Sequence, residues 1–330
     1  MPEMRAVVIT APGGPEVLEI QSRPIPEPGL SQIRVRVRAS ALNRADVSQR
    51  IGRYPAPAGV PADISGLEYS GEVDAFGPGA TMWKPGDRVM GIVGGGGHAE
   101  YLCVHEREAI AIPLELTWEE AAAIPEVFLT AYDALFRQLF VRPGETLLIH
   151  AVGSGVGTAA VQLARVAGVH AIGTSRTPEK LRRAGELGMG AGLEASADWP
   201  EKVLAQTDGA GVHAILDLVG AGYLAGNLNV LAPQGRMISV GLTAGSRAEL
   251  DMSVLMRKRL RILGTVLRAR PIEEKIALAR DFGARVLPFF SSRRLRPVLD
   301  SVHSFTDIRE AHGLMESDSS FGKIVLRWDP

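Results

Sequence analysis

A glycine-rich turn between an apolar strand and a helix constrains this chain more than any other feature. The run 147–149 predicts a buried strand, and Gly153, Gly155 and Gly157 follow it closely, with apolar positions at helical spacing from Val156 onward. A turn without side chains lets the backbone approach a pyrophosphate, and the following helix offers unpaired N–H groups and a positive dipole. The pattern therefore predicts a dinucleotide site, although an ordinary strand-to-helix connection can contain the same glycines.

The end of the next expected strand, 170–174, indicates which nucleotide is preferred. NAD sites carry Asp or Glu about 20 residues past the glycines, where the carboxylate accepts the ribose 2′-hydroxyl. Here Ser175 and Arg176 hold that place, and Lys180 lies one helical turn further on. Arg and Lys complement a 2′-phosphate that a carboxylate would repel. We therefore predict NADPH as the cofactor; the alternative is that Arg176 and Lys180 are solvated surface charges.

Length and composition exclude several classes of protein. The chain has 330 residues, enough for two domains with separate cores, and its formal net charge is −1. That balance gives no reason to expect a nucleic acid or a membrane as partner, no window approaches about 18 uninterrupted apolar residues, and no signal-peptide layout is visible. The single cysteine, Cys103, excludes an internal disulfide and a multi-cysteine zinc site. We expect a cytoplasmic protein.

The pattern of the chain changes near residue 121. Residues 1–121 contain short alternating strands broken by proline and glycine, which predict an antiparallel, barrel-like β domain. From 122 to 267 helices and strands alternate, which predicts a doubly wound parallel sheet. The last segment, 268–330, ends in an expected strand, 323–327, that would rejoin the first domain. Further elements are expected at helices 120–140, 156–167 and 178–188 and at strands 146–150, 213–218, 237–241 and 261–266.

Several segments spread over nearly the whole chain resemble one protein family. In these segments the chain resembles the zinc-free, zeta-crystallin-like quinone oxidoreductases of the medium-chain dehydrogenase/reductase superfamily, and most closely the tumour-suppressor-inducible quinone reductase subgroup. The resemblance implies an α/β fold with a GroES-like catalytic domain, a Rossmann domain and a cofactor cleft between them. It also implies a homodimer in which strand 261–266 pairs across a two-fold axis. Besides the glycine turn, the matching segments are Pro12-Gly-Gly-Pro15, Ala41-Leu-Asn-Arg-Ala-Asp46, Gly66-Leu-Glu68 with Gly71, Lys84-Pro-Gly-Asp87-Arg-Val89, Ala122-Ala-Ile-Pro125, Leu129-Thr130-Ala131 and Gly322-Lys323-Ile-Val325.

The positions that bind catalytic zinc in one branch of this superfamily differ here. That branch uses a Cys, a His that follows a Gly, and a second Cys or an Asp. The corresponding stretches read Asn43-Arg-Ala-Asp46 and Gly66-Leu67-Glu68, and leucine offers no lone pair. The four cysteines of the structural zinc lobe are also missing. Because zinc takes three or four N, S or O ligands in one place, we expect no metal.

The expected lack of a metal restricts the substrate. Without a Lewis acid to polarise an alcohol or a simple ketone, the substrate must already be electrophilic. A quinone or a conjugated carbonyl compound qualifies, since hydride addition yields a resonance-stabilised anion. We therefore predict NADPH-dependent reduction of a quinone by transfer of a hydride or of single electrons, with the protein supplying proximity and orientation. Two alternatives stay open: reduction of an enone, an enal or a 2-enoyl thioester, and a nucleotide-binding structural protein with little turnover.

The turn and the resemblance together indicate the cofactor contacts. The phosphates would lie on 151–157, where Ser154 replaces a glycine common in the family; its hydroxyl could contact the nicotinamide or a substrate oxygen, or only cap the helix. Thr130 resembles a residue at the nicotinamide face, Lys323 resembles one that reaches the cofactor phosphates, and 241–242 lie where strand ends meet the ligand. The expected cofactor residues are Asn43, Thr130, Ala151, Gly153, Ser154, Gly155, Val156, Gly157, Ser175, Arg176, Lys180, Gly241, Leu242 and Lys323.

Three residues are the candidates for catalytic contact with the substrate: Tyr54, Asn43 and Ser154. Asn43 and Tyr54 resemble polar positions that face the nicotinamide in the family. The Tyr54 phenol could bind a quinone oxygen or give it a proton, and an ordinary phenol pKa of about 10 favours binding over proton donation. A tyrosine at the rim with no chemical role is the alternative.

Overall fold

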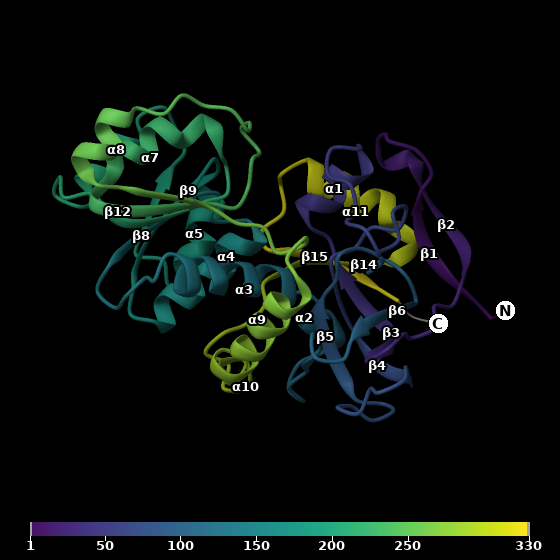
Figure 1. The fold of residues 1–330 in the computed structure, drawn as a ribbon. Coiled ribbons are helices and arrows are strands. Elements are labelled where there is room, and N and C mark those ends of the chain that lie inside the picture. Colours follow the sequence, from purple (N-terminus) through teal and green to yellow (C-terminus); the bar gives the residue numbers. More distant parts are fainter. Residues whose placement is uncertain (1, 329–330) are drawn as a thin grey trace. The chain divides into compact units, whose positions relative to one another are not determined.

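The computed structural model describes residues 2–328 and divides the chain into two compact units (Figure 1). Unit 1 contains the residues up to Leu129 and those from Leu267 onward, and unit 2 contains Thr130–Val266. The sequence placed the boundaries after 121 and after 267. In the structure the first boundary follows Leu129, and the second lies one residue earlier than expected, since Leu267 belongs to unit 1. Ala122 and Ala123 belong to unit 1 because they pack in a small buried cluster with residues of its sheet, Ala39, Ala41 and Val325.

The segment expected to form one helix over 120–140 is broken, so that prediction is wrong. It forms α2 (Trp118–Ala122), α3 (Pro125–Tyr132) and a π-helical stretch (Asp133–Gln138). Pro125 has no N–H to donate and its ring disfavours helical backbone just before it, so α2 ends and α3 starts anew at the proline. Thr117 caps α2 by accepting a hydrogen bond from the Glu120 amide at 3.2 Å.

A seven-stranded sheet forms the core of unit 1. Its order is β14-β15-β3-β4-β5-β7, with β6 also paired to β3. Most neighbours are antiparallel, as expected, but β14 and β15 run parallel. In β3 the alternate residues Ile33, Val35 and Val37 are buried in the core, as the period of two requires. The strands are β3 (Gln32–Ala41), β4 (Glu68–Phe76), β5 (Arg88–Ile92), β6 (Tyr101–His105), β7 (Ile110–Ala111), β14 (Leu299–Ser304) and β15 (Lys323–Arg327).

Unit 1 also contains strands and helices that lie outside this sheet. A separate antiparallel pair, β1 and β2, opens the described chain. β15 pairs with the far end of β3, through Val325 and Ala41, so the last segment of the chain completes the first sheet. The elements are β1 (Glu3–Ile9), β2 (Leu18–Pro24), α1 (Arg44–Arg50), α9 (Ile272–Arg285), α10 (Pro288–Ser291) and α11 (Ile308–Glu316).

Unit 2 is a parallel six-stranded sheet with the order β10-β9-β8-β11-β12-β13. Numbered along the chain this is 3-2-1-4-5-6, the doubly wound order of dinucleotide-binding domains, which confirms the predicted fold class. No helix within residues 2–328 is long and apolar enough to cross a bilayer. The elements are β8 (Thr146–Ile149), α4 (Gly155–Val166), β9 (His170–Ser175), α5 (Pro178–Glu186), β10 (Ala191–Glu194), α6 (Trp199–Ala205), β11 (Val212–Asp217), α7 (Leu224–Val230), β12 (Leu231–Ser239), α8 (Met252–Lys258) and β13 (Arg261–Gly264).

Candidate nucleotide and substrate sites

The glycine turn follows β8, a central strand of the unit 2 sheet. Ala151 adopts a left-handed backbone with φ of 49°, and Ser154 begins α4 by accepting a hydrogen bond from the Gly157 amide at 3.1 Å. A Cβ at Gly157 would lie 2.6 Å from the carbonyl oxygen of Val152, so only glycine lets α4 start this close to the strand. The residues therefore fit a pyrophosphate bound at a helix N-terminus. Ser154 is a helix cap, and its contact with nicotinamide or substrate stays a prediction.

The end of β9 lies beside this turn. The Val152 amide donates to the Thr174 carbonyl at 3.0 Å, which aligns the turn with the strand end. Ser175 is buried there, whereas Arg176 is exposed and Lys180 is partly exposed on α5. The structure thus brings Ser175 and Arg176 to the same sheet edge as the glycine turn.

The ends of β11 and β12 complete that edge. A Cβ at Gly241 would lie 2.5 Å from the carbonyl oxygen of Leu218, so the loop after β12 packs closely on the end of β11. Leu242 follows with an exposed side chain, while Thr130 is buried on α3. Ligands of doubly wound sheets bind outside the carboxyl ends of the strands, which is where 151–157 and 241–242 both lie.

A buried polar network, which sequence reasoning missed, fixes these strand ends. His150 is fully buried; its Nδ1 lies 2.8 Å from Thr174 Oγ1 and its Nε2 lies 2.7 Å from Asn227 Oδ1. Asn227 in turn donates to Asp217 at 3.3 Å, and Asp217 accepts from the Gly220 amide at 3.0 Å. Burial lowers the pKa of His150 to about 4, so the ring is neutral at pH 7. The network ties β8, β9 and β11 together beneath the turn.

In unit 1 a buried ion pair lies where β15 meets the end of β3. Lys323 Nζ is 2.7 Å from Glu68 Oε1, and it also donates to the Leu42 carbonyl at 2.5 Å and to Asn43 Oδ1 at 2.7 Å. The Asn43 amide group donates to Glu68 Oε1 at 3.0 Å. All three ammonium protons of Lys323 are therefore used inside unit 1. Its expected contact with the cofactor phosphates stays a prediction, and it requires that Lys323 exchange one of these partners.

The donor atoms at this place do not fit a zinc ion. Asp46 accepts hydrogen bonds from the backbone amides of Asn43 at 2.7 Å and Gly66 at 2.8 Å, and Glu68 is neutralised by Lys323. Leu67, which stands where the zinc branch has histidine, is buried at 1% exposure. Among residues 2–328, no group of three His, Cys, Asp or Glu side chains is arranged to hold a metal.

Tyr54 and Glu126 are partly exposed members of the same cluster. The Arg268 guanidinium lies 4.9 Å from the centroid of the Tyr54 ring and donates to Gln49 Oε1 at 2.5 Å. Desolvation raises the pKa of Tyr54, although the charge of Arg268 opposes this. The Glu126 amide donates to Glu68 Oε2 at 2.8 Å, whereas the Glu126 carboxyl has no hydrogen bond or ion pair within residues 2–328. Desolvation and the neighbouring Glu68 charge raise the pKa of Glu126 to about 8.

Sequence reasoning found part of this cluster. Tyr54 and Asn43 lie in unit 1, while Ser154 lies in unit 2. Glu126 and Arg268 were missed. A signal for Glu126 was present, because it is the one charged residue in the otherwise apolar run 121–129. No sequence pattern marks Arg268.

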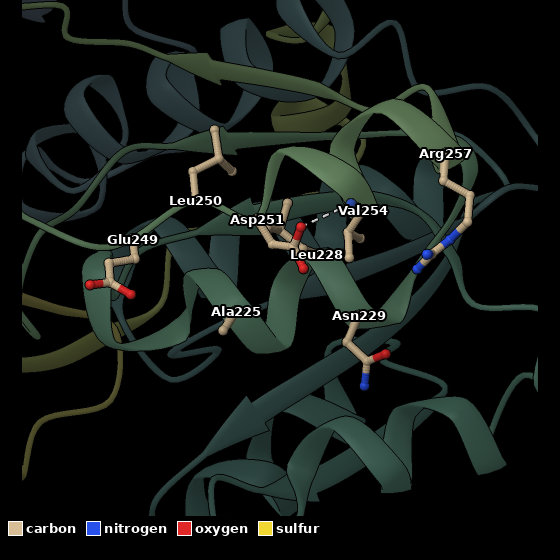
Figure 2. A pocket seen from close by; sticks show the side chains of 8 residues that line it. All are labelled: Ala225, Leu228, Asn229, Glu249, Leu250, Asp251, Val254 and Arg257. Carbon is tan, nitrogen blue, oxygen red and sulfur yellow. Dashed lines mark hydrogen bonds between the residues drawn. The ribbon is translucent and has the colours of Figure 1, made fainter.

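A separate groove of about 400 Å³ lies on unit 2 next to α7 and α8, and Figure 2 shows the side chains that line it. The Asp251 carboxylate there caps α8, accepting from the Val254 amide at 3.2 Å. None of the residues expected to bind cofactor or substrate lines this groove. We assign no ligand to it.

Comparison with known proteins identifies the class. Residues 29–114 match the alcohol dehydrogenase GroES-like domain and residues 155–284 match the zinc-binding dehydrogenase domain, a pairing that defines medium-chain dehydrogenases/reductases. The quinone oxidoreductase of Pseudomonas aeruginosa is 37% identical over 256 residues, 77% of this chain and 78% of that protein. The quinone oxidoreductase of Lama guanicoe is 31% identical over 327 residues, 98% and 97% of the two chains. The chain therefore belongs to the quinone oxidoreductase-like members of the medium-chain dehydrogenase/reductase superfamily, as its sequence motifs predicted.

Solved structures agree on the fold and differ in chemistry. A protein described as an NAD-dependent alcohol dehydrogenase is 36% identical with a TM-score of 0.87, covering 99% of this chain and 100% of its own. A mycobacterial protein in complex with NADPH is 27% identical with a TM-score of 0.89 over 98% and 100%. The CurK enoyl reductase is 25% identical with a TM-score of 0.87 over 99% of both chains. These similarities support an NAD(P)-dependent oxidoreductase.

Proposed function

We propose that this protein reduces quinones with NADPH by hydride transfer that needs no metal ion. The observation that carries the proposal is the buried pair of Lys323 and Glu68, with Leu67 beside it, at the position where related enzymes hold zinc. A site without a Lewis acid suits a substrate that is already electrophilic, and a quinone is one. The names of the Pseudomonas aeruginosa and Lama guanicoe relatives support the same substrate class.

NADPH would supply the hydride, and residues of unit 2 would bind this nucleotide. The turn 151–157 would bind the pyrophosphate, Ser175, Arg176 and Lys180 the 2′-phosphate, and Thr130 and 241–242 the nicotinamide half. The exposed side chain of Arg176 at the sheet edge supports this assignment, because charge-assisted hydrogen bonds from arginine are strong and geometrically matched to phosphate.

The substrate would be held by Tyr54 and Asn43, with Ser154 as a further contact. The Asn43 amide group donates to the Ala41 carbonyl at 3.3 Å and to Glu68 at 3.0 Å, and its oxygen accepts from Lys323 at 2.7 Å. A contact with the substrate would therefore require that Asn43 exchange one of these partners. The Tyr54 phenol makes no hydrogen bond within residues 2–328, so it can donate to a carbonyl oxygen. Because desolvation raises the pKa of this phenol, we assign it to substrate positioning.

The proposal extends to a homodimer that works in the cytoplasm. β13 is an edge strand of the unit 2 sheet, and an edge that pairs with a second copy no longer exposes its backbone groups. Ile262 and Val266 have exposed fractions of 37% and 56% along this edge. A groove of about 370 Å³ lies beside it, lined by Ser239, Val240, Leu242, Gly264, Thr265 and Val266.

A second candidate function is the reduction of an enone, an enal or a 2-enoyl thioester. The similarity to the CurK enoyl reductase favours it, and the same site would serve, since hydride addition to a conjugated carbonyl compound also needs no metal. A nucleotide-binding protein with little turnover is the remaining alternative.

Initial rates of NADPH oxidation test these functions. The substrates are 1,2-naphthoquinone and 9,10-phenanthrenequinone, with trans-2-hexenal and NADH as matched comparisons, before and after EDTA treatment. Quinone-dependent turnover that prefers NADPH and survives EDTA supports the proposal. Turnover with the enal alone supports the second candidate, and nucleotide binding without turnover on either leaves a binding protein.

A further inference from the structure

We propose that Glu126 is the acid that delivers a proton to the substrate oxygen as the substrate is reduced, an inference that rests on the proposed quinone reduction. Reduction of a quinone consumes one hydride and one proton, and neither Tyr54 nor Asn43 is well suited to supply that proton. The observations that point to Glu126 are its place in the cluster, its unbonded carboxyl and the charges around it.

The backbone of Glu126 is fixed, whereas its carboxyl is unengaged. Glu126 follows Pro125 in the first turn of α3, and its amide is held by Glu68 Oε2 at 2.8 Å. The carboxyl has no hydrogen bond or ion pair within residues 2–328, and the residue is partly exposed. This differs from Glu68 and Asp46, whose oxygens all accept hydrogen bonds and which are both 0% exposed. Of the three carboxyls, Glu126 is therefore the one that combines solvent access with oxygens that accept no hydrogen bond within the described chain.

The charged groups around Glu126 come from four other parts of unit 1 and favour the neutral carboxyl. Desolvation raises the pKa of Glu126 most, the anions of Glu68 and Asp46 raise it further, and the cations of Lys323 and Arg268 lower it. Desolvation acts with the anions, so the balance places the pKa at about 8 and keeps a proton on Glu126 at neutral pH. An acid with such a pKa is well matched to donation near pH 7, because the protonated form is populated and its proton is still readily lost. The groups lie on β4 (Glu68), α1 (Asp46), β15 (Lys323) and the segment before α9 (Arg268). Tyr54 is a further titratable neighbour, because the charge of Glu126 raises the pKa of its phenol.

Two neighbouring groups are poorer proton donors. Desolvation raises the pKa of Tyr54 above its ordinary value of 10.0, which weakens it as an acid. His98 is 0% exposed, bonded to Ser40 at 2.9 Å, and burial lowers its pKa, so it carries no extra proton at pH 7. Tyr54 therefore positions the substrate, and Glu126 donates the proton.

The proposed step balances in electrons and protons. The quinone receives a hydride, which is two electrons and one proton, from the reduced nicotinamide nucleotide and so gains a negative charge on one oxygen. The O–H bond of the Glu126 carboxyl breaks and an O–H bond forms at that oxygen, which gives the hydroquinone. Glu126 is left as a carboxylate and regains a proton from solvent through its exposed side.

The test compares Glu126→Gln with the full-length wild type, and Glu115→Gln serves as the matched control. Glu115 is exposed on the loop before α2 and belongs to no part of the cluster. Single-turnover rates with NADPH and 1,2-naphthoquinone, measured from about pH 6 to pH 10, separate the chemical step from product release. Infrared difference spectra of protein with ¹³C-labelled glutamate, recorded without nucleotide, report whether Glu126 holds a proton at pH 7.

The expected results are specific. Glu126→Gln lowers the single-turnover rate by about 10²-fold at pH 7 with little change in KM for the quinone, and it abolishes the fall in rate that wild type shows above about pH 8. The protonated-carboxyl band disappears in Glu126→Gln and persists in Glu115→Gln. A Glu126→Gln variant that keeps the wild-type rate and pH profile overturns the inference.

Two further outcomes keep the inference separate from the proposed function and from folding. If wild type itself does not oxidise NADPH with any quinone, the proposed function fails first, and with it the inference. If Glu126→Gln does not fold, Glu126→Asp and the wild-type infrared titration decide instead. An ionised Glu126 at pH 7 in that titration overturns the inference whatever the activity.

Discussion

Lys323 Nζ lies 2.7 Å from Glu68 Oε1, and the two side chains are 3% and 0% exposed. Lys323 begins the last strand of the chain and Glu68 begins β4, so the pair links the C-terminal segment to the centre of the unit 1 sheet. Two buried charges are tolerated because each neutralises the other and Asn43 bonds to both. Removal of one partner leaves the other uncompensated.

Lys323→Met is expected to lower the free energy of unfolding by about 3–5 kcal/mol, because the Glu68 charge would stay buried without a partner. Urea denaturation followed by circular dichroism measures this. The double variant Glu68→Gln, Lys323→Met should recover part of the loss, and Arg182→Ala, at an exposed ion pair of α5, should leave stability unchanged. A Lys323→Met variant as stable as wild type would show that the pair contributes nothing.

Arg176→Ala and Lys180→Ala are expected to weaken NADPH binding by about 10-fold to 10²-fold each, while NADH binding changes little. Each change removes a charge-assisted contact to the 2′-phosphate, which NADH lacks. Fluorescence titration with both nucleotides measures the ratio of the two Kd values. Arg182→Ala is the control, since Arg182 lies on α5 with Lys180. Equal losses for NADPH and NADH would contradict the assignment of the 2′-phosphate to these residues.

Gly157→Ala is expected to abolish tight nucleotide binding and to destabilise unit 2 by about 1–3 kcal/mol, a typical result of overpacking. Its Cβ would meet the Val152 carbonyl oxygen at 2.6 Å, so α4 must shift away from the strand. Gly185→Ala on α5 is the control, because its Cβ meets no atom within 4 Å. That change should raise stability by about 0.5–1 kcal/mol. Calorimetry with and without NADPH measures both effects, and normal binding by Gly157→Ala would refute the close approach.

The stability of wild type should fall relative to Glu126→Gln as the pH rises. The folded-state pKa of Glu126, about 8, is above the value of 4.5 for an unperturbed glutamate. The neutral carboxyl therefore favours folding fully below about pH 4.5, and this contribution is lost as the pH rises to about 8. We expect the difference in unfolding free energy to grow by about 2 kcal/mol between about pH 5 and pH 9, less than a fully buried group would give. Parallel urea curves for the two proteins at all pH values would contradict the raised pKa.

Ile262→Glu in β13 is expected to convert the proposed homodimer into monomers, because a charge on that edge opposes pairing with a second copy. Sedimentation velocity over a range of protein concentrations measures the oligomeric state. The matched control is Val302→Glu, which places the same charge on β14, an edge strand of the other sheet. A wild-type protein that is monomeric at all concentrations would refute the dimer, and loss of the dimer in both variants would refute its location.

The sequence alone predicted the parts of this protein that depend on neighbouring residues. Period-two and helical patterns located β8, β9, α4 and β15 to within a residue or two, because burial of one face leaves that periodicity in the sequence. The glycine turn was also visible in the sequence. A close approach of backbone to backbone excludes side chains at fixed positions, and such positions are occupied by glycine. The helix predicted over 120–140 was wrong because it ran through Pro125, where α3 starts anew after α2.

Only the tertiary structure determined the chemistry of the candidate substrate site. Glu68, Glu126, Arg268 and Lys323 lie far apart in the sequence, and no local pattern states that they share one cluster. The pKa of Glu126 depends on desolvation and on the distances to Glu68, Asp46, Lys323 and Arg268. Those distances exist only after β15 has paired with β3 and α3 has packed beside β4. The sequence therefore predicted the fold and the glycine turn, whereas the raised pKa of Glu126 arises only from packing.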